Sequence, residues 1–230
     1  MNGTALAEKL TGPGSIWLEA ARSAVHDEPA ALTYYFPAVS RRCGRDPLND
    51  FDPHGARHGC VDDAARGVLL SALTLRGPAR LALLEDLYRH GDAGEKRGLL
   101  RGLHLLGELG PALLPLVEDA LRTNDVRLVA AAVQVYGARH LGQEAYRHAV
   151  VKCVFTGIPL QAIPNLAARQ DGELARMLVD LAHERTAAGR DIPADIHAVV
   201  AAFPDCLDRP DLCVELLSAL LPETAAPNPE

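Results

Sequence analysis

Apolar residues recur every three or four positions along most of this chain, which is the spacing of helices with one buried face. The pattern is most regular from Val61 onward, where short polar or glycine-containing junctions separate the apolar stretches. From it we expect a series of helices and no β-strands of any size. The expected helices cover residues 64–75, 81–88, 95–106, 113–121, 126–139, 146–155, 160–168, 174–187, 196–203 and 212–221.

The pattern before Val61 is less regular. Ser15 is placed to cap a helix that carries Ile16 and Trp17, and a second helix is expected near residues 30–35. Pro37 should interrupt that second helix. Residues 41–59 contain three glycines, two prolines and three aspartates, so we predict a long irregular connection there. Long loops of this kind inside compact domains are often functional.

Two junctions between expected helices stand 33 residues apart, at Gly91-Asp92 and at Asn124-Asp125. Gly91 is suited to end a helix in the left-handed conformation, and Asp92 with Glu95 has the spacing of a capping box. Asp125 is expected to cap the following helix. Repetition at this interval is typical of stacked hairpins, so we predict an all-α, HEAT-like array of antiparallel helical hairpins, with a compact bundle as the alternative. The single domain is expected to span residues 15–222, between a flexible N-terminus (1–14) and a disordered tail (223–230).

Composition supports an all-α fold and excludes several classes of protein. The chain has 37 alanines and 36 leucines, which favour helices, whereas aromatic residues make up only 4% and disfavour a β-sandwich or barrel. A net charge of −7 disfavours a nucleic-acid partner. The five cysteines are odd in number and widely spaced, so no disulfide framework is expected. No apolar run is long enough for a membrane span and no signal-peptide pattern is present, so we expect a cytoplasmic protein.

A group of metal-ligand types lies at the end of the irregular connection. His54, His58 and Cys60 are followed by Asp62 and Asp63, and such a loop could hold zinc if four ligands converge. The spacing matches no specific zinc pattern. Histidines on a solvated loop and aspartates that cap the next helix explain these residues better, so we predict no metal and no cofactor.

The two junctions also carry the polar residues most suited to a site. His90 ends a helix beside Asp92, where the pair could exchange protons near neutral pH. Arg122 has routine ion-pair spacing with Glu118 and Asp119 on a helix surface. If consecutive hairpins stack, these junctions share one edge of the array. That edge is the predicted site, although helix capping alone explains most of the residues there.

Lys152 and Cys153 form a further candidate, on a helix that starts near Gln143. Glu144, His148 and Lys152 fall at intervals of four and line one polar stripe, whereas Cys153 lies on the apolar stripe. A buried thiol beside a solvated face is the ordinary interpretation, and Cys153 has no evident base to activate it. The chain has none of the familiar phosphate-loop, serine-hydrolase or zinc-protease motifs.

Five longer motifs occur in order along the chain: LTYYFPAVSRRCGR (32–45), VDDAAR (61–66), LYRHGD (87–92), EDALRTND (118–125) and VKCVFTGIPL (151–160). This series resembles the EboA-domain family of bacterial proteins over roughly residues 15–205. The resemblance implies a role in bacterial secondary metabolism, alongside a UbiA-like prenyltransferase, a sugar-phosphate-cyclase-like enzyme and TIM-barrel proteins, and a link to metabolite traffic across the envelope. It implies no settled reaction. The family positions fall on Asp63, Arg66, His90, Asp92, Arg122, Asn124, Lys152 and Cys153, and not on His54 or His58.

Two hypotheses from different classes follow. The first is a non-enzymatic accessory protein that binds a small metabolite, prenylated or phosphorylated, or a partner pathway enzyme, in a groove of its helical array. The second is an enzyme acting on an anionic or prenylated metabolite. Its catalytic residues would be His90, Asp92, Lys152 and Cys153, with substrate bound by Asp63, Arg66, Arg122 and Asn124; His90 and Asp92 would move protons, and Arg122 and Lys152 would hold the anion.

Overall fold

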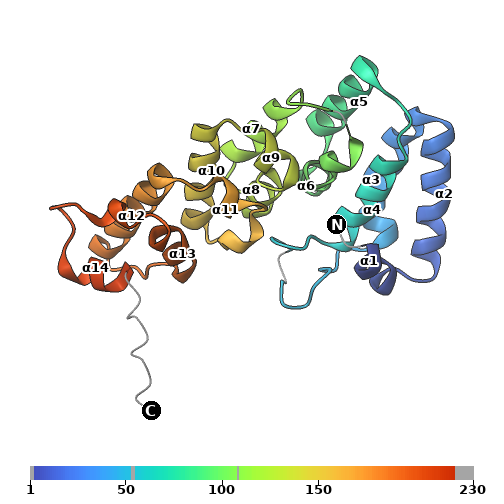
Figure 1. Cartoon of the computed structure of the whole chain (residues 1–230). Coiled ribbons are helices and arrows are strands. Elements are labelled where there is room, and N and C mark those ends of the chain that lie inside the picture. Colours follow the sequence, from blue (N-terminus) through green and yellow to red (C-terminus); the bar gives the residue numbers. More distant parts are fainter. Residues whose placement is uncertain (1–2, 53–54, 108, 221–230) are drawn as a thin grey trace, which may run out of the picture. The chain divides into compact units, whose positions relative to one another are not determined.

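A computed structural model describes residues 3–52, 55–107 and 109–220 of the chain, and these are mostly helical (Figure 1). No β-strand occurs within these ranges; one isolated bridge joins Pro47 to Cys60. The predicted all-α class is confirmed, whereas the HEAT-like arrangement stays a prediction. None of the helices in the described ranges is both long and apolar enough to span a bilayer.

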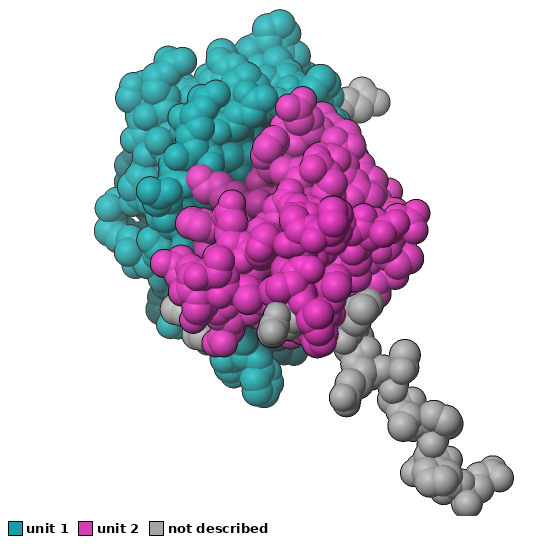
Figure 2. Space-filling model, turned by 90° about the vertical axis from the view of Figure 1, so that its left-hand side faces the viewer, with its two compact units in different colours: residues 1–141, 162–164 teal, residues 142–161, 165–230 magenta. Residues whose placement is uncertain are grey.

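The chain divides into two compact units, which are coloured separately in Figure 2. Unit 1 comprises residues 1–141 and 162–164, and unit 2 comprises residues 142–161 and 165–230. The domain limits of 15–222 stay a prediction, and the predicted tail at 223–230 lies outside the described residues.

Unit 1 begins with helices that run longer than the sequence pattern predicts. The prediction that Ser15 caps a helix is wrong, because α2 begins at Pro13 and the Ser15 hydroxyl donates a hydrogen bond to the Gly12 carbonyl inside the first turn. The prediction that Pro37 ends a helix is also wrong, because α3 continues through it; a proline removes only one backbone donor and needs an adjusted carbonyl one turn earlier. These helices are α1 (Gly3–Lys9), α2 (Pro13–Asp27), the 3₁₀ turn η1 (Pro29–Ala31) and α3 (Leu32–Cys43).

The connection from α3 to α4 (Val61–Ala72) is irregular but well hydrogen-bonded. The Leu48 N–H donates to the Gly59 carbonyl at 3.1 Å, and the Val61 N–H donates to the Asp46 carbonyl at 2.8 Å. The Asp52 carboxylate accepts the backbone N–H groups of residues 56, 57 and 58 at 2.7–2.9 Å. This loop is therefore held to the start of α4 by specific bonds.

Two consecutive helix pairs complete the main part of unit 1. Asp92 accepts the Glu95 N–H at 2.8 Å and Asp125 accepts the Arg127 N–H at 2.9 Å, so both predicted caps are confirmed. The prediction that Gly91 is left-handed is wrong, because its backbone is extended, with φ −73°. An added Cβ at Gly91 would lie 2.7 Å from the Leu87 carbonyl oxygen. The helices are α5 (Gly77–His90), α6 (Ala93–Gly102), the 3₁₀ turn η2 (Leu103–Leu106), α7 (Leu114–Arg122), α8 (Val126–Ala132) and α9 (Val135–His140).

The core of unit 1 is built from helices in series. Helix α5 packs on α6 and α7 packs on α8, while α4, α6 and α8 contact one another in that order. The most extensive contact is between α4 and α6, and two glycines of α6 lie in it. A Cβ at Gly98 would lie 2.5 Å from Cδ of Arg66, and a Cβ at Gly102 would lie 2.5 Å from Cδ1 of Leu70. Side chains at these two positions would push α4 and α6 apart.

The helix expected at 126–139 is broken into α8 and α9 at residues 133–134. The Gln134 side-chain amide donates to the carbonyls of Ala130 and Ala162, at 3.1 and 3.0 Å, and so satisfies backbone acceptors at the break. Gly137 follows, and a Cβ there would lie 1.8 Å from the Ala132 carbonyl oxygen. The apolar spacing runs through the break unchanged, which is why periodicity alone predicts one helix.

Unit 2 is centred on α12, against which α10, α13 and α14 pack. The helix expected at 160–168 is replaced by a 3₁₀ turn and a four-residue helix, separated by Asn165 in the left-handed region at φ 57°. The elements are α10 (Gln143–Thr156), η3 (Leu160–Ala162), α11 (Leu166–Arg169), α12 (Gly172–Ala187), η4 (Ala194–Ile196), α13 (His197–Ala201), η5 (Pro204–Leu207) and α14 (Val214–Leu220).

Asp171 joins α10 to α12 in unit 2. It caps α12 by accepting the Leu174 N–H at 2.9 Å, and it accepts side-chain bonds from Gln143 and Arg147, each at 2.7 Å. The hydrogen bonds from Arg147 are the main reason why the pKa of Asp171 is lowered to about 2. Asp171 therefore favours the folded state in its ionised form.

Replacing Asp171 by asparagine should destabilise unit 2 in a pH-dependent way. The folded pKa lies below the ordinary value of 3.8, so the stabilisation is present above that pH and is lost as pH falls toward 2. We expect a loss of about 1–2 kcal/mol at neutral pH, after allowing for solvent screening of the ion pair. Urea unfolding at several pH values should show the variant and the wild type converging near pH 2. Asp191→Asn, exposed in a loop of the same unit, is the control, and parallel curves would contradict the prediction.

Candidate functional site

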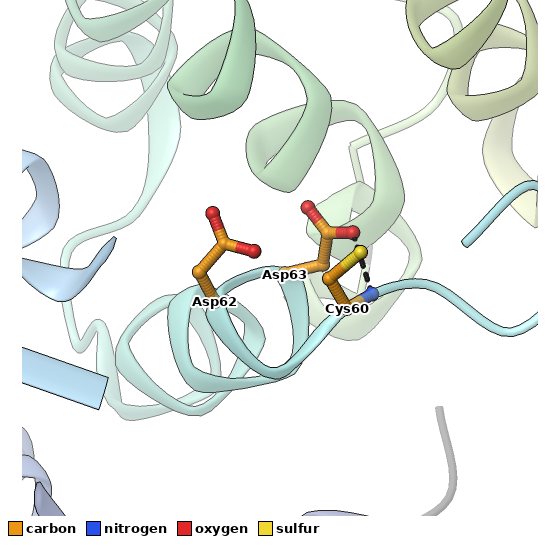
Figure 3. Close-up of side chains that lie close together, drawn as sticks. All are labelled: Cys60, Asp62 and Asp63. Carbon is orange, nitrogen blue, oxygen red and sulfur yellow. Dashed lines mark hydrogen bonds between the residues drawn. The ribbon is translucent and has the colours of Figure 1, made fainter. Parts of the chain in front are cut away.

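The largest group of buried charges lies where α4 meets α6. Its members, which we call the buried ion cluster, are each at most 6% exposed: Asp62, Asp63, Arg66, Arg97 and Arg101. The aspartates belong to the first turn of α4, and their carboxylates point off the same side of that turn (Figure 3). Buried charges are rare in proteins unless they are paired.

Arg97 of α6 joins the two carboxylates. Its Nη2 donates to Asp62 Oδ1 at 2.9 Å, and its Nε donates to Asp63 Oδ1 at 2.7 Å. Arg66 donates from Nη1 to Asp62 Oδ2 at 2.8 Å. The remaining oxygen, Asp63 Oδ2, accepts the Cys60 N–H at 2.9 Å (Figure 3). All four carboxylate oxygens therefore have a donor.

Arg66 extends the cluster to α3. Its Nη2 donates to the Ser40 hydroxyl at 2.8 Å, its Nη1 to the Gly94 carbonyl at 3.2 Å and its Nε to the Phe36 carbonyl at 3.3 Å. The Ser40 hydroxyl in turn donates to Asp62 at 2.9 Å. Only a guanidinium presents donors in so many directions, so a lysine could not replace Arg66.

The bonds of the buried ion cluster indicate that its residues stabilise the packing of three helices. Asp63 and Arg66, predicted to bind substrate, are each 1% exposed and make the bonds that hold α3, α4 and α6 together. A ligand would reach these two side chains only by displacing those bonds. Their contact with a substrate stays a prediction.

The metal-ligand types at this point are arranged as an ion-pair cluster. Ligand atoms of Cys60, Asp62 and Asp63 lie within 4.8 Å of one another (Figure 3). The carboxylate oxygens face guanidinium groups and a backbone N–H, and burial raises the pKa of the Cys60 thiol. Of the two loop histidines, His58 places Nδ1 3.3 Å from Asp52, and His54 lies outside the described residues. A cation would therefore meet positive charge on the α6 side.

A groove of about 440 Å³ opens beside α5, α6 and α7. We call it the α5–α7 groove. Three cations line it, Arg89 from α5, Lys96 from α6 and Arg122 from α7. Within the described ranges, the side chains of Arg89 and Arg122 form no ion pair or hydrogen bond. The rest of the lining is Glu85, Tyr88, Ala112, Pro115, Leu116 and Asp119.

Tyr88 engages the groove's aspartate and its lysine. Its hydroxyl donates to Asp119 Oδ2 at 2.9 Å, and the Lys96 ammonium lies 4.8 Å from the centroid of its ring. Burial, and then Asp119, raise the pKa of Tyr88, so the phenol keeps its proton. The predicted ion pair of Arg122 with Glu118 or Asp119 is wrong, because Asp119 accepts from Tyr88 instead. Arg122 keeps its charge facing the groove.

A smaller depression of about 240 Å³ lies at the N-terminus of α6. Asp92 lines it together with Arg97 and Asp62 of the buried ion cluster. Arg127, just after the second junction, also lines it and lies 3.4 Å from Asp125. Asp92 of the first predicted junction therefore meets a residue next to the second junction, whereas Asn124 and Asp125 do not line this depression.

The chain matches the family model described as "Metabolite traffic protein EboA" over residues 3–201. The chain belongs to the EboA family. The resemblance that the sequence motifs indicate is thus confirmed over most of the chain. Searches of curated proteins and of solved structures found no match.

The predicted junction residues of this EboA protein have different surroundings. Arg122 lines the α5–α7 groove and Asp92 lines the depression at α6. His90 and Asn124 are exposed and line neither hollow. Nδ1 of His90 lies 3.1 Å from Oδ1 of Asp86, which belongs to the preceding helical turn. Proton transfer by His90 and Asp92 stays a prediction, as does a binding role for Asn124.

Lys152 and Cys153 lie on α10 of the EboA protein, in unit 2. Lys152 is half-buried, whereas Cys153 is completely buried. Burial raises the pKa of the Cys153 thiol to about 12. A nucleophilic cysteine has to be accessible and ionised, and Cys153 is neither in this structure. The catalytic role of the two residues stays a prediction.

Thiol labelling tests the state of Cys153 directly. Cys213 is exposed and should react within the first phase of labelling by a disulfide reagent, whereas Cys153 should react only after unfolding. The measurement is mass spectrometry of peptides after timed labelling of the native protein at neutral pH. Cys213→Ser is the control and should remove the fast phase. Rapid native labelling of Cys153 would show that its thiol is accessible and would contradict this expectation.

Sequence reasoning missed most residues of the α5–α7 groove of this EboA protein. Tyr88 and Arg89 lie within the LYRHGD motif, but the site residue predicted from that part of the motif was His90. Lys96 is one of only three lysines in the chain, but it lies in none of the five family motifs. The usable signal was the recurrence of basic residues near the ends of consecutive helices.

Proposed function

We propose that this EboA protein is a non-enzymatic accessory protein that binds an anionic small-molecule metabolite in the α5–α7 groove. The observation that carries the proposal is the set of three cations, Arg89, Lys96 and Arg122, around one groove. Two of them have no intramolecular partner among the described residues. The description of the family as a metabolite traffic protein agrees with this class of function.

The groove supports a ligand that has both an anionic group and an apolar part. Its two acidic residues are Glu85 and Asp119, and Asp119 is already engaged by the Tyr88 hydroxyl. Phosphate groups prefer such clusters of guanidinium and ammonium donors. Beside the cations lie Ala112, Pro115 and Leu116, which offer a hydrophobic floor to a hydrocarbon chain. A prenylated or otherwise apolar phosphate has this combination.

Isothermal titration with three probes tests the proposal. Farnesyl diphosphate carries both parts, inorganic diphosphate only the anion and farnesol only the chain. We expect farnesyl diphosphate to bind more tightly than either fragment. Arg122→Ala and Lys96→Ala should each weaken it about tenfold, because a lost charge-assisted contact costs about 1.5 kcal/mol.

Arg42→Ala is the matched control, because Arg42 is exposed on α3 and lies outside the lining of the groove. It removes the same charge and should leave the affinity unchanged. Equal weakening by Arg42→Ala and Arg122→Ala would mean that only the overall charge matters, and the proposed site would be wrong. Absence of binding by farnesyl diphosphate would remove the amphipathic ligand class.

Two other functions are hypotheses that the α5–α7 groove does not itself support. A partner pathway enzyme is a second occupant that the family association suggests. Enzymatic activity by His90 and Asp92 stays the alternative, and neither residue lines the α5–α7 groove. We favour binding without catalysis because the groove presents cations to a ligand while its phenol is held protonated by burial and Asp119.

A further inference from the structure

We propose that unit 1 contains a second binding site, a cavity beside Arg101 that takes a phosphate group. The cavity has a volume of about 300 Å³ and lies between the α3–α4 connection, α6, the 3₁₀ turn η2 and the start of α9. Its polar lining residues are Asn49, Arg57, His58, Arg101, His104 and Gln134. None of its described lining residues is acidic, although the chain as a whole carries a charge of −7. The site shares no lining residue with the α5–α7 groove and does not depend on the function proposed for that groove.

Arg101 supplies the buried positive charge of this cavity. Its side chain is 95% buried, as its exposure of 5% shows. Nη2 donates to the carbonyls of Gly55 and Ala56, at 2.5 and 2.7 Å. Nε is buried and makes no hydrogen bond within the described ranges; the nearest carboxylate oxygen, on Asp63, is 3.7 Å away. The chain therefore compensates the charge of Arg101 incompletely, and an anion in the cavity would stabilise that charge through space.

The charge balance of the buried ion cluster also favours an anion in this cavity. The cluster contains three arginines and two aspartates, so one positive charge is not matched inside it. Arg97 and Arg66 hold the aspartate oxygens at short distance, which leaves Arg101 as the least compensated member. Burial lowers the pKa of Arg101, a sign that the folded chain does not fully stabilise its charge. An anion in the adjoining cavity would complete the balance.

The other lining residues suit a phosphate oxygen as ligand. Arg57 is a second guanidinium at the lining. His58 is 40% exposed there and, with Nδ1 3.3 Å from Asp52 Oδ2, has its other ring nitrogen left for a ligand. Several donors around one small cavity match the several acceptor oxygens of phosphate. The same group is present in free phosphate and in the head of a phosphorylated metabolite, so the experiment separates these sources.

Thermal unfolding in rising inorganic phosphate, at constant ionic strength kept with sodium chloride, tests the site. A ligand that binds only the folded state raises the midpoint progressively, with the logarithm of its concentration once that exceeds the dissociation constant. We expect such a rise, and a parallel series with glycerol 3-phosphate identifies the source. A tighter response to glycerol 3-phosphate assigns the site to a phosphorylated metabolite, and an equal response assigns it to the phosphate group alone.

Variants locate the site. Arg101→Lys should abolish the rise, and circular dichroism shows whether this variant folds. If Arg101→Lys does not fold, the double variant Arg57→Ala, His58→Ala tests the site instead, because both residues lie toward the surface. This double variant should weaken phosphate binding at least tenfold. Arg42→Ala, on α3 and outside the lining, should keep the wild-type response.

Three results would overturn the proposal. The first is a midpoint no higher in phosphate than in chloride of equal ionic strength. The second is a response that the Arg57 and His58 double variant leaves unchanged. The third is a phosphate response that disappears in Arg122→Ala, since phosphate would then occupy the α5–α7 groove. Failure of the cavity site would leave the farnesyl diphosphate test of the groove unaffected.

Discussion

Replacing Asp62 by asparagine is expected to lower the free energy of unfolding by about 3–5 kcal/mol, the cost of breaking a buried ion pair. Asp62 is 1% exposed and accepts from Arg66, Arg97 and Ser40. Asparagine has nearly the same shape but carries no charge and presents an NH₂ group to one guanidinium. Three buried arginines would then remain with the single carboxylate of Asp63.

Urea unfolding followed by circular dichroism measures the effect. Asp86→Asn is the matched control, because Asp86 makes an exposed ion pair with His90 and its side chain is 56% exposed. Exposed pairs contribute at most about 1 kcal/mol, so the control should lie near the wild type. Adding Arg66→Met to Asp62→Asn should cost less than the sum of the single changes, since the two side chains are coupled. Equal effects of Asp62→Asn and Asp86→Asn would show that the cluster is not structurally important.

Replacing Gly137 by alanine is expected to destabilise the protein by about 3 kcal/mol or more, through overpacking. The added Cβ would lie 1.8 Å from the Ala132 carbonyl oxygen and 3.2 Å from Cγ1 of Val117. The carbonyl belongs to the backbone and cannot rotate away as a side chain can. Helix propensity alone predicts the opposite sign, because alanine is favoured over glycine by about 1 kcal/mol inside a helix.

Chemical denaturation distinguishes the two expectations. Gly142→Ala is the control, because no atom lies within 4 Å of a Cβ at this exposed position. It should change stability by less than about 1 kcal/mol, the range of a helix N-cap exchange. A Gly137→Ala protein as stable as the wild type would mean that the break between α8 and α9 adjusts freely. Gln134 lies in that break, Val135 follows it, and both line the cavity beside Arg101. The variant should therefore also weaken phosphate binding there.

Local signals were sufficient for much of the fold. The caps at Asp92 and Asp125 could be predicted because each satisfies backbone N–H groups within one helical turn. The passage of α3 through Pro37 could not, because neighbouring helices outweigh the loss of one backbone bond. The break at residues 133–134 depends on a contact with Ala162, which is distant in sequence.

The candidate site was harder to predict than the fold, for a related reason. Arg122 was singled out, but Arg89 and Lys96 are ordinary surface charges until α5, α6 and α7 bring them to one groove. Asp63 and Arg66 were recognised from a motif, while their buried partners Arg97 and Arg101 lie more than thirty residues away. Which charges meet is decided by tertiary packing, and a single sequence gives no direct measure of it.

The division of the buried ion cluster between two helices constrains how unit 1 is assembled during synthesis. Helix α4 supplies both carboxylates but only one guanidinium, and α6 supplies the other two. A ribosome releases α4 about thirty residues before α6, since elongation proceeds from the N-terminus. Asp62 can pair with Arg66 of its own helix, but Asp63 has no guanidinium partner until α6 emerges, so burying the start of α4 before then would be costly.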